Sequence, residues 1–148
     1  MSRGEDRSGI STLTEKMWAL QTAYDFLKSA GETTIYIIGK SFGGIVVSHW
    51  LSEYGRDGEI DVSIMGYVPG EGNILTDSLR GRLRVVVRGE HDKYASPSQV
   101  MGELAAHHID ADVIEIANAD HSYRDNSNIN SAEYAFQDTA IDELLNDI

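Results

Sequence analysis

The sequence predicts an α/β protein, a reduced parallel sheet of about four strands flanked by helices. Three segments, Thr34–Ile38, Val62–Val68 and Leu83–Val87, are strongly apolar, and the first of them is apolar on both faces, as a strand buried on both sides is. Segments with helical periodicity alternate with them, which indicates parallel strands joined by helices. The chain has 148 residues, the size of one domain.

The composition excludes several classes of function. The 24 acidic and 12 basic residues give a net charge of −12, which repels phosphate backbones and anionic lipids, so we expect neither nucleic acid nor a membrane as a partner. The absence of cysteine removes disulfides, thiolate catalysis and iron–sulfur clusters, and we expect no metal and no cofactor. No apolar run approaches the ~20 residues of a membrane span, and the first residues lack a secretory signal, which predicts a cytoplasmic protein.

Residues 1–11 are polar and charged, which predicts a disordered lead-in followed by a single domain over residues 12–148. The segment Thr12-Leu13-Thr14-Glu15 has the capping-box pattern and predicts the start of a helix. Apolar residues recur behind it with helical spacing, and Gly31 ends the segment. They are Leu13, Met17, Leu20, Tyr24 and Leu27.

The first apolar strand, Thr34–Ile38, is followed by a predicted helix from Gly43 to Tyr54. The apolar residues of this helix form one continuous face, and Gly55 ends it. After the strand Val62–Val68, the link of residues 69–82 is too polar for a good helix and predicts a loop or short turn.

Beyond the third strand, Leu83–Val87, the residues Ser96 and Pro97 suit an N-cap and a first helical position. The segment Asp112–Ile116 alternates apolar and polar residues, as an edge strand does. Asn130–Ile148 carries apolar residues on one helical face and predicts a closing helix. Ligands and catalytic groups collect at the carboxyl ends of parallel strands, so a site is expected among the residues that follow each strand.

The first of these places holds Gly39-Lys40-Ser41-Phe42-Gly43, the pattern G-x-S-x-G between a strand and a helix. A serine in this strained turn presents its hydroxyl above the sheet, and Gly39 and Gly43 leave out side chains that would obstruct the turn. The N–H of Phe42, at the start of the helix, would face an oxyanion formed on a substrate. The G-x-S-x-G pattern alone is weak evidence for a catalytic serine, because it often occurs by chance. Its position between a buried strand and an amphipathic helix is much stronger evidence.

Acidic and histidine residues follow the third and fourth strands. Asp92 ends the segment RGEHD, and His121 lies in the segment ADHS. Serine, acid and histidine, each just past a strand, stand in the chain order of one catalytic-triad arrangement. Ser41 is a poor nucleophile until His121 takes its proton, and Asp92 would hold the imidazole in the right tautomer.

These three segments resemble the α/β-hydrolase superfamily, most closely its dienelactone-hydrolase and small-esterase-like members. IYIIGKSFGG is similar to the family's nucleophile elbow, VVVRGEHDKYASP to its acid loop and ADHSYRD to its histidine loop. The resemblance runs from about Thr12 to the C-terminus. It implies Ser41 as nucleophile, Asp92 as acid and His121 as base of a serine hydrolase, which would cleave a small carboxylic ester or thioester through an acyl-enzyme.

The sequence departs from that family before the elbow. In the family the elbow follows the fifth strand of an eight-stranded sheet, whereas one helix precedes Thr34–Ile38 here. The loop that supplies the second oxyanion donor is among the missing parts, so the chain resembles a truncated α/β-hydrolase with a half-built oxyanion hole. The alternative function is a weakly active or non-catalytic module that works through oligomerisation or a partner chain. Because Thr34–Ile38 becomes an uncharged edge, we expect a homodimer or higher oligomer sealed along it.

Some residues compete for the roles above. Gly39-Lys40-Ser41 also ends a phosphate-binding loop, but Thr34 occupies the place of that motif's first glycine. His91 is an alternative base to His121. The alternative acids are Glu71, Glu90 and Asp120.

The remaining candidates favour plainer roles. Lys40 suits a cation at the rim of the site, and His49 a surface or packing residue. Adjacent histidines point to different helical faces, so His107 and His108 favour a helix C-terminus over a metal site. Three aromatic residues are interpreted as packing residues. Two aromatic residues, one of them also in the first group, could instead line a pocket for the acyl group. The first are Tyr94, Tyr123 and Trp50, and the second are Tyr123 and Phe42.

Overall fold

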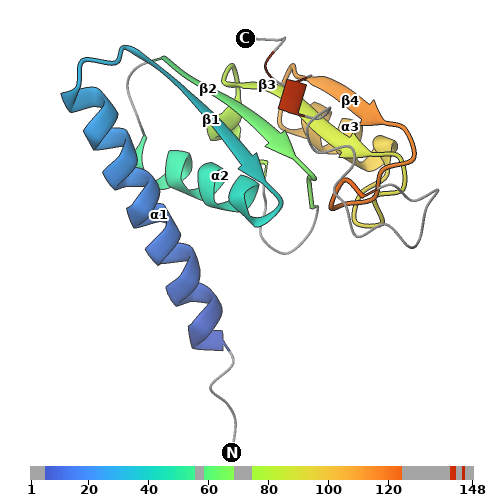
Figure 1. The fold of residues 1–148 in the computed structure, drawn as a ribbon, viewed down its shortest axis with the longest axis horizontal. Coiled ribbons are helices and arrows are strands. Elements are labelled where there is room, and N and C mark those ends of the chain that lie inside the picture. The colour runs from blue at the N-terminus through green and yellow to red at the C-terminus, as the bar shows by residue number, and fades with distance from the viewer. Residues whose placement is uncertain (1–5, 56–58, 69–74, 125–140, 143–144, 146–148) are drawn as a thin grey trace, which may run out of the picture.

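The computed structural model describes residues 6–55, 59–68, 75–124, 141–142 and 145, and side chains from residue 12 onward. Helices and strands alternate along the described chain, as the sequence predicts (Figure 1). In chain order they are α1 (Asp6–Ser29), β1 (Thr34–Lys40), α2 (Phe42–Tyr54), β2 (Glu59–Met65), the 3₁₀ turn η1 (Asp77–Leu79), β3 (Leu83–Gly89), α3 (Pro97–Ala106) and β4 (Asp112–Ile116).

The four described strands form one sheet in the order β1-β2-β3-β4, and every neighbouring pair is parallel. The predicted α/β class with a four-stranded parallel sheet is therefore confirmed. Because the strands are parallel, the residues after β1, β3 and β4 meet at one edge, the carboxyl end of the sheet. β1 and β4 are the outer strands of the described sheet (Figure 1).

Four of the described helical elements, α1, α2, η1 and α3, pack on one face of the sheet. The main core cluster joins α1, α2, η1 and α3 to alternate residues of the strands, such as Ile60, Val62 and Ile64 of β2. Trp50 of α2 is fully buried at its centre, meets the ring of Tyr24 edge-on at 5.3 Å between centroids, and donates to Gln21 at 2.9 Å. These contacts fix α1 onto α2. None of the described helices is both long enough and apolar enough to cross a bilayer.

The second core cluster lies on the other face of the sheet. It holds Met65 of β2, Val87 of β3 and Ile116 of β4, packed against Tyr123, which follows β4. On the same face Ile38 of β1 is 41% exposed. The second face is therefore better covered over β3 and β4 than over β1.

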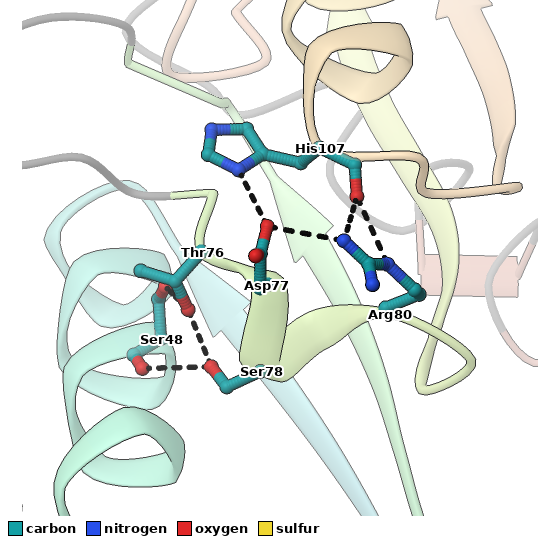
Figure 2. A network of polar contacts seen from close by, with 6 residues as sticks. All are labelled: Ser48, Thr76, Asp77, Ser78, Arg80 and His107. Carbon is teal, nitrogen blue, oxygen red and sulfur yellow. Dashed lines mark hydrogen bonds and ion pairs between the residues drawn. The ribbon is translucent and has the colours of Figure 1, made fainter.

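A polar network ties the link between β2 and β3 to the neighbouring helices (Figure 2). The buried Ser48 of α2 donates to Thr76 at 3.1 Å, and Asp77 of η1 lies 3.2 Å from His107 Nδ1 at the end of α3. The network comprises Ser48, Thr76, Asp77, Ser78, Arg80 and His107. Residues 75–82 of the predicted loop thus form a short, hydrogen-bonded turn, and His107 lies at a helix C-terminus.

Several predicted boundaries are wrong. α1 begins at Asp6 and not at Thr12, so residues 6–11 of the predicted lead-in belong to the helix. The capping-box pattern of residues 12–15 lies inside that helix and does not mark its start. A pattern of only four residues also occurs by chance within helices. β2 ends at Met65 and not at Val68, because Gly66 adopts a left-handed φ of 64° that no strand continues through. Residues 1–5 lie outside the described residues, as does the predicted closing helix except for residues 141, 142 and 145, which are helical.

Candidate active site

The structure brings together the three side chains that the sequence selects. Ser41 Oγ lies 3.0 Å from His121 Nε2, and His121 Nδ1 lies 2.8 Å from Asp92 Oδ2. The three residues come from the turns after β1, β4 and β3, and Ser41 and His121 are 80 positions apart in the chain. The Asp92 side chain is 1% exposed and that of His121 17%, so the chain of hydrogen bonds leads from a buried carboxylate toward the surface.

Ser41 lies in a strained turn between β1 and α2. Its φ of 50° and ψ of −115° are rarely adopted by residues other than glycine. The turn is held because the Ser41 N–H donates to the Met65 carbonyl at 2.8 Å and its own carbonyl accepts from Gly44 at 2.9 Å. A Cβ on Gly39 would lie 2.9 Å from the backbone of Gly43, so glycine is required at position 39. This is the predicted elbow.

The reason given for the second glycine of the pattern is wrong. A Cβ on Gly43 would meet no heavy atom within 4 Å, since it is the backbone of Gly43, not its missing side chain, that approaches Gly39. Phe42 is the first residue of α2, and its N–H belongs to the turn whose amides lack partners within the helix. β1 continues to Lys40 as a strand, which excludes the phosphate-binding loop.

The loop after β3 fixes the carboxylate. Asp92 Oδ1 accepts from the Tyr94 N–H at 2.9 Å, which leaves Oδ2 for the histidine. Below the loop, the buried Arg88 guanidinium donates to the Ala95 carbonyl at 2.8 Å and pairs with Glu115 of β4. The carboxylate is therefore held on one oxygen by its own loop, and the loop is anchored to β4.

The acid loop and the histidine loop are bonded directly to each other. The His91 N–H donates to the Ala119 carbonyl at 2.8 Å, and the Glu90 carboxylate accepts from the Asn118 N–H at 2.7 Å. A Cβ on Gly89 would lie 2.3 Å from the Ala119 carbonyl oxygen, so the two chains pass too closely for any side chain at position 89. The relative position of Asp92 and His121 follows from these contacts.

Two further residues hold the imidazole ring from its sides. A Cβ on Gly66, after β2, would lie 3.0 Å from His121 Cε1, so the bare backbone of Gly66 faces the ring. The ring of Tyr94 meets the imidazole edge-on, with 4.5 Å between centroids and an interplanar angle of 64°. Tyr94 is 47% exposed, so it packs against the imidazole at the surface and not within the core. The sequence pattern does not predict this role for Gly66, because the predicted strand Val62–Val68 runs through it.

Tyr123 and Trp50 are packing residues, as predicted, since both side chains are fully buried. The Tyr123 hydroxyl donates to the Val87 carbonyl at 2.9 Å, and burial raises the pKa of this phenol well above its ordinary value. Lys40 lies with its Nζ 5.4 Å from the Tyr123 ring centroid, at the rim of the site. Phe42 is 39% exposed beside the elbow, where it remains a candidate for contact with a substrate.

A hollow of about 400 Å³ opens beside His121. Residues of the acid loop and the histidine loop line it, among them Lys93, Tyr94 and Ser122. A hollow of about 470 Å³ lies at the opposite, amino end of β2 and β3, where Arg84 is paired with Asp61 at 2.6 Å. Of these two hollows, the one beside His121 adjoins the site, through the histidine of the three bonded side chains.

The competing acids and bases have other contacts. Asp120 caps its own turn by accepting from the N–H groups of Ser122 and Arg124, and Glu90 is bonded to Asn118. Glu71 lies outside the described residues. Of His91 and His121, it is His121 that bridges the hydroxyl and the carboxylate. Among the described residues, no three histidine or carboxylate side chains are grouped so as to hold a metal ion.

Comparisons with known proteins match the fold of the chain and not its sequence. No family model and no curated protein matches the sequence. The crystal structure of an uncharacterized Bacillus cereus protein matches with a TM-score of 0.62 and 18% identity, covering 90% of this chain and 44% of that one. A dienelactone hydrolase-like promiscuous phosphotriesterase from metagenomic libraries matches with a TM-score of 0.50 and 19% identity, covering 77% and 51%. A protein designated a YdeN-like hydrolase, from Pectobacterium atrosepticum, matches with a TM-score of 0.52 and 18% identity, covering 90% and 70%.

The chain has an α/β-hydrolase-like fold, which confirms the resemblance inferred from the three motifs. It spans 44% and 51% of the lengths of the first two structures, so about half of each has no counterpart in it. At such low identity these similarities define the architecture alone.

Proposed function

We propose that the protein is a serine hydrolase that cleaves a small carboxylic ester or thioester through an acyl-enzyme. The observation that carries this proposal is the unbroken chain of hydrogen bonds from Ser41 through His121 to Asp92, at 3.0 and 2.8 Å. The strained elbow supports it, because backbone strain held in place by surrounding bonds is typical of catalytic sites.

In the first half of the reaction, Ser41 Oγ attacks the carbonyl carbon while its proton passes to His121 Nε2. Asp92 accepts from Nδ1–H, which keeps the proton-accepting nitrogen toward the serine and stabilises the imidazolium that forms. The negative charge on the substrate oxygen faces the Phe42 N–H at the start of α2. The tetrahedral intermediate collapses, the alcohol or thiol leaves with the proton from His121, and the acyl group stays on Ser41.

In the second half, His121 takes a proton from a water molecule, which attacks the acyl carbonyl. The second tetrahedral intermediate releases the carboxylic acid, and the proton returns from His121 to Ser41. The hollow beside His121 leaves room for the water and for one side of a small substrate.

Turnover is expected to be modest if the Phe42 N–H acts alone. Removing one of two oxyanion donors costs about 10²–10³-fold in turnover. The second candidate function, a weakly active or non-catalytic module that works through oligomerisation or a partner chain, is favoured by one observation: about half of the first two matching structures has no counterpart in this chain.

A fluorophosphonate probe distinguishes the two functions. The hydrolase should be labelled stoichiometrically, and Ser41→Ala should lose both the label and the hydrolysis of p-nitrophenyl acetate. Ser52→Ala, which changes an exposed serine on the same helix α2, is the matched control and should keep both. If the folded wild-type protein is not labelled, the hydrolase proposal is wrong and the module is favoured.

A further inference from the structure

The outer edge of β1 has the backbone groups of an unfinished sheet. β1 pairs with β2 along its whole length, and no other described strand pairs with it. The Ser41 N–H donates to Met65 on β2, and backbone groups alternate in direction along a strand. The N–H and C=O groups of four residues therefore point to the outer edge: Thr34, Tyr36, Ile38 and Lys40.

The two outer strands of the described sheet differ in how their edges are protected. β4 carries Asp112 and Glu115, and charges on an edge strand discourage pairing with another chain. β1 carries no charge from Thr34 to Gly39, and its Ile38 is 41% exposed. Of the two outer strands of the described sheet, β1 is therefore the one that is less protected against pairing with a further strand.

We propose that two copies of the chain pair antiparallel through β1, about a two-fold axis at Ile37. In this register Tyr36 lies opposite the partner's Ile38, and Thr34 lies opposite the partner's Lys40. Among two-fold antiparallel registers of this edge, it is the one that pairs all four outward-pointing residues. The two sheets then continue into one another, and each copy forms the same contacts.

The side chains agree with this register. Residues directly opposite in an antiparallel pair lie on the same face, so the exposed Ile38 packs against the partner's Tyr36 on the less covered face of the sheet. Within each chain the Thr34 hydroxyl donates to Glu59 at 2.9 Å. At each end of the pairing, the Lys40 ammonium therefore lies near the partner's Thr34 and the partner's Glu59. Two pairs of opposite charge thus lie within the contact between molecules that each carry −12.

The pairing also affects the elbow. The register that places Lys40 opposite the partner's Thr34 places Ser41 and Phe42 beside the partner's Thr33 and the partner's Glu32. The open side of the elbow is then covered by the turn between α1 and β1 of the second copy. The proposal rests on the backbone of β1 and does not depend on the proposed hydrolase activity.

Proline substitution tests the pairing without disturbing the fold. Ile38→Pro removes one N–H that points outward. An edge strand tolerates proline at such a position because the hydrogen bonds to β2 remain. Val113→Pro on β4 is the matched control. The Ile116 carbonyl accepts from the Glu90 N–H, directly after β3, so the backbone groups of position 113 point outward. By sedimentation equilibrium at tens of micromolar, the wild type and Val113→Pro should be dimers and Ile38→Pro a monomer with an unchanged far-UV CD spectrum. A monomeric wild type, or a dimer that persists in Ile38→Pro, would overturn the proposal.

Cysteine cross-linking tests the register. The chain has no cysteine, so one introduced residue can only react with its copy in the partner. Ile37→Cys places two thiols across the axis in a non-hydrogen-bonded pair, where Cα atoms lie about 4.5 Å apart, within disulfide range. Ile37→Cys should form a disulfide-linked dimer on mild oxidation, and Tyr36→Cys, whose copies lie two positions out of register, should not. Cross-linking of Tyr36→Cys in place of Ile37→Cys would show that the register is wrong.

Discussion

The two sides of the candidate site are built differently. On the side of β3 and β4, the loops that carry Asp92 and His121 are bonded to each other at the backbone, through Glu90 and through the close passage at Gly89. On the other side, Ser41 follows β1, the outer strand whose far edge has no partner among the described residues. The acid–base pair is therefore positioned by this chain alone, whereas the surroundings of the nucleophile depend on what lies against β1.

The largest effect on kcat is expected from replacing Asp92, the buried carboxylate of the acid–base pair. In Asp92→Asn the amide no longer holds His121 in the tautomer that accepts the serine proton, so kcat for p-nitrophenyl acetate should fall by about 10⁴-fold. Asp120→Asn changes a neighbouring carboxylate that caps its own turn and should leave kcat within about tenfold. If Asp92→Asn retains most of the activity, the carboxylate does not orient the histidine, and the proposed mechanism is wrong.

A smaller loss is expected from displacing the imidazole. In Gly66→Ala the new Cβ lies 3.0 Å from His121 Cε1, and a shift of the ring by about 1 Å can cost about 10²-fold in kcat. Gly81→Ala is a matched control, because Gly81 also has a positive φ, at 72°, and its Cβ would meet nothing within 4 Å. Both variants should lose about 1 kcal/mol of unfolding free energy in urea, from strain at positive φ. Equal losses of kcat in the two would mean that Gly66 affects the fold and not the ring.

The comparison also shows which parts of the site the sequence could reveal. Ser41, Asp92 and His121 were predictable because each follows a strand, and parallel strands bring such residues to one end of a sheet. The roles of Gly66 and Tyr94 were not, because they depend on the distance between loops, which local patterns do not specify. Gly66 did carry a signal, since an isolated glycine inside a strand pattern is typical of a bulge or of a close approach of another group to the backbone.

The ends of the helices and strands were likewise predictable where a local pattern marks them. β4 was predicted at its observed residues because the alternation of its polar and apolar residues is a local feature. The start of α1 was placed at the capping box of Thr12, whereas the helix begins six residues earlier, at Asp6. Whether the edge of β1 pairs with a second copy is equally a property of surfaces, which periodicity does not describe. That is why the dimer stays a prediction.

The smallest expected effect concerns Tyr123, which packs behind the histidine loop on the well-built side. Burial raises the pKa of its phenol, so above pH 10 the unfolded chain releases this proton while the folded chain keeps it. The unfolded state then binds fewer protons than the folded state, and the unfolding free energy falls as the pH rises beyond that point. Tyr123→Phe removes this contribution, at a cost near pH 7 of about 1 kcal/mol for the lost bond to the Val87 carbonyl.

Urea unfolding at pH 7 and at pH 10.5 measures the difference. The unfolding free energy of Tyr123→Phe should decline less between the two pH values than that of the wild type. Tyr67→Phe is the comparison on the helix-covered face, where burial and the nearby Glu103 carboxylate also raise the phenol pKa, so its decline should be reduced as well. Equal declines in the wild type and Tyr123→Phe would mean that water reaches the phenol. The loop behind His121 would then be no better enclosed than the edge of β1, and the contrast between the two sides of the site would be lost.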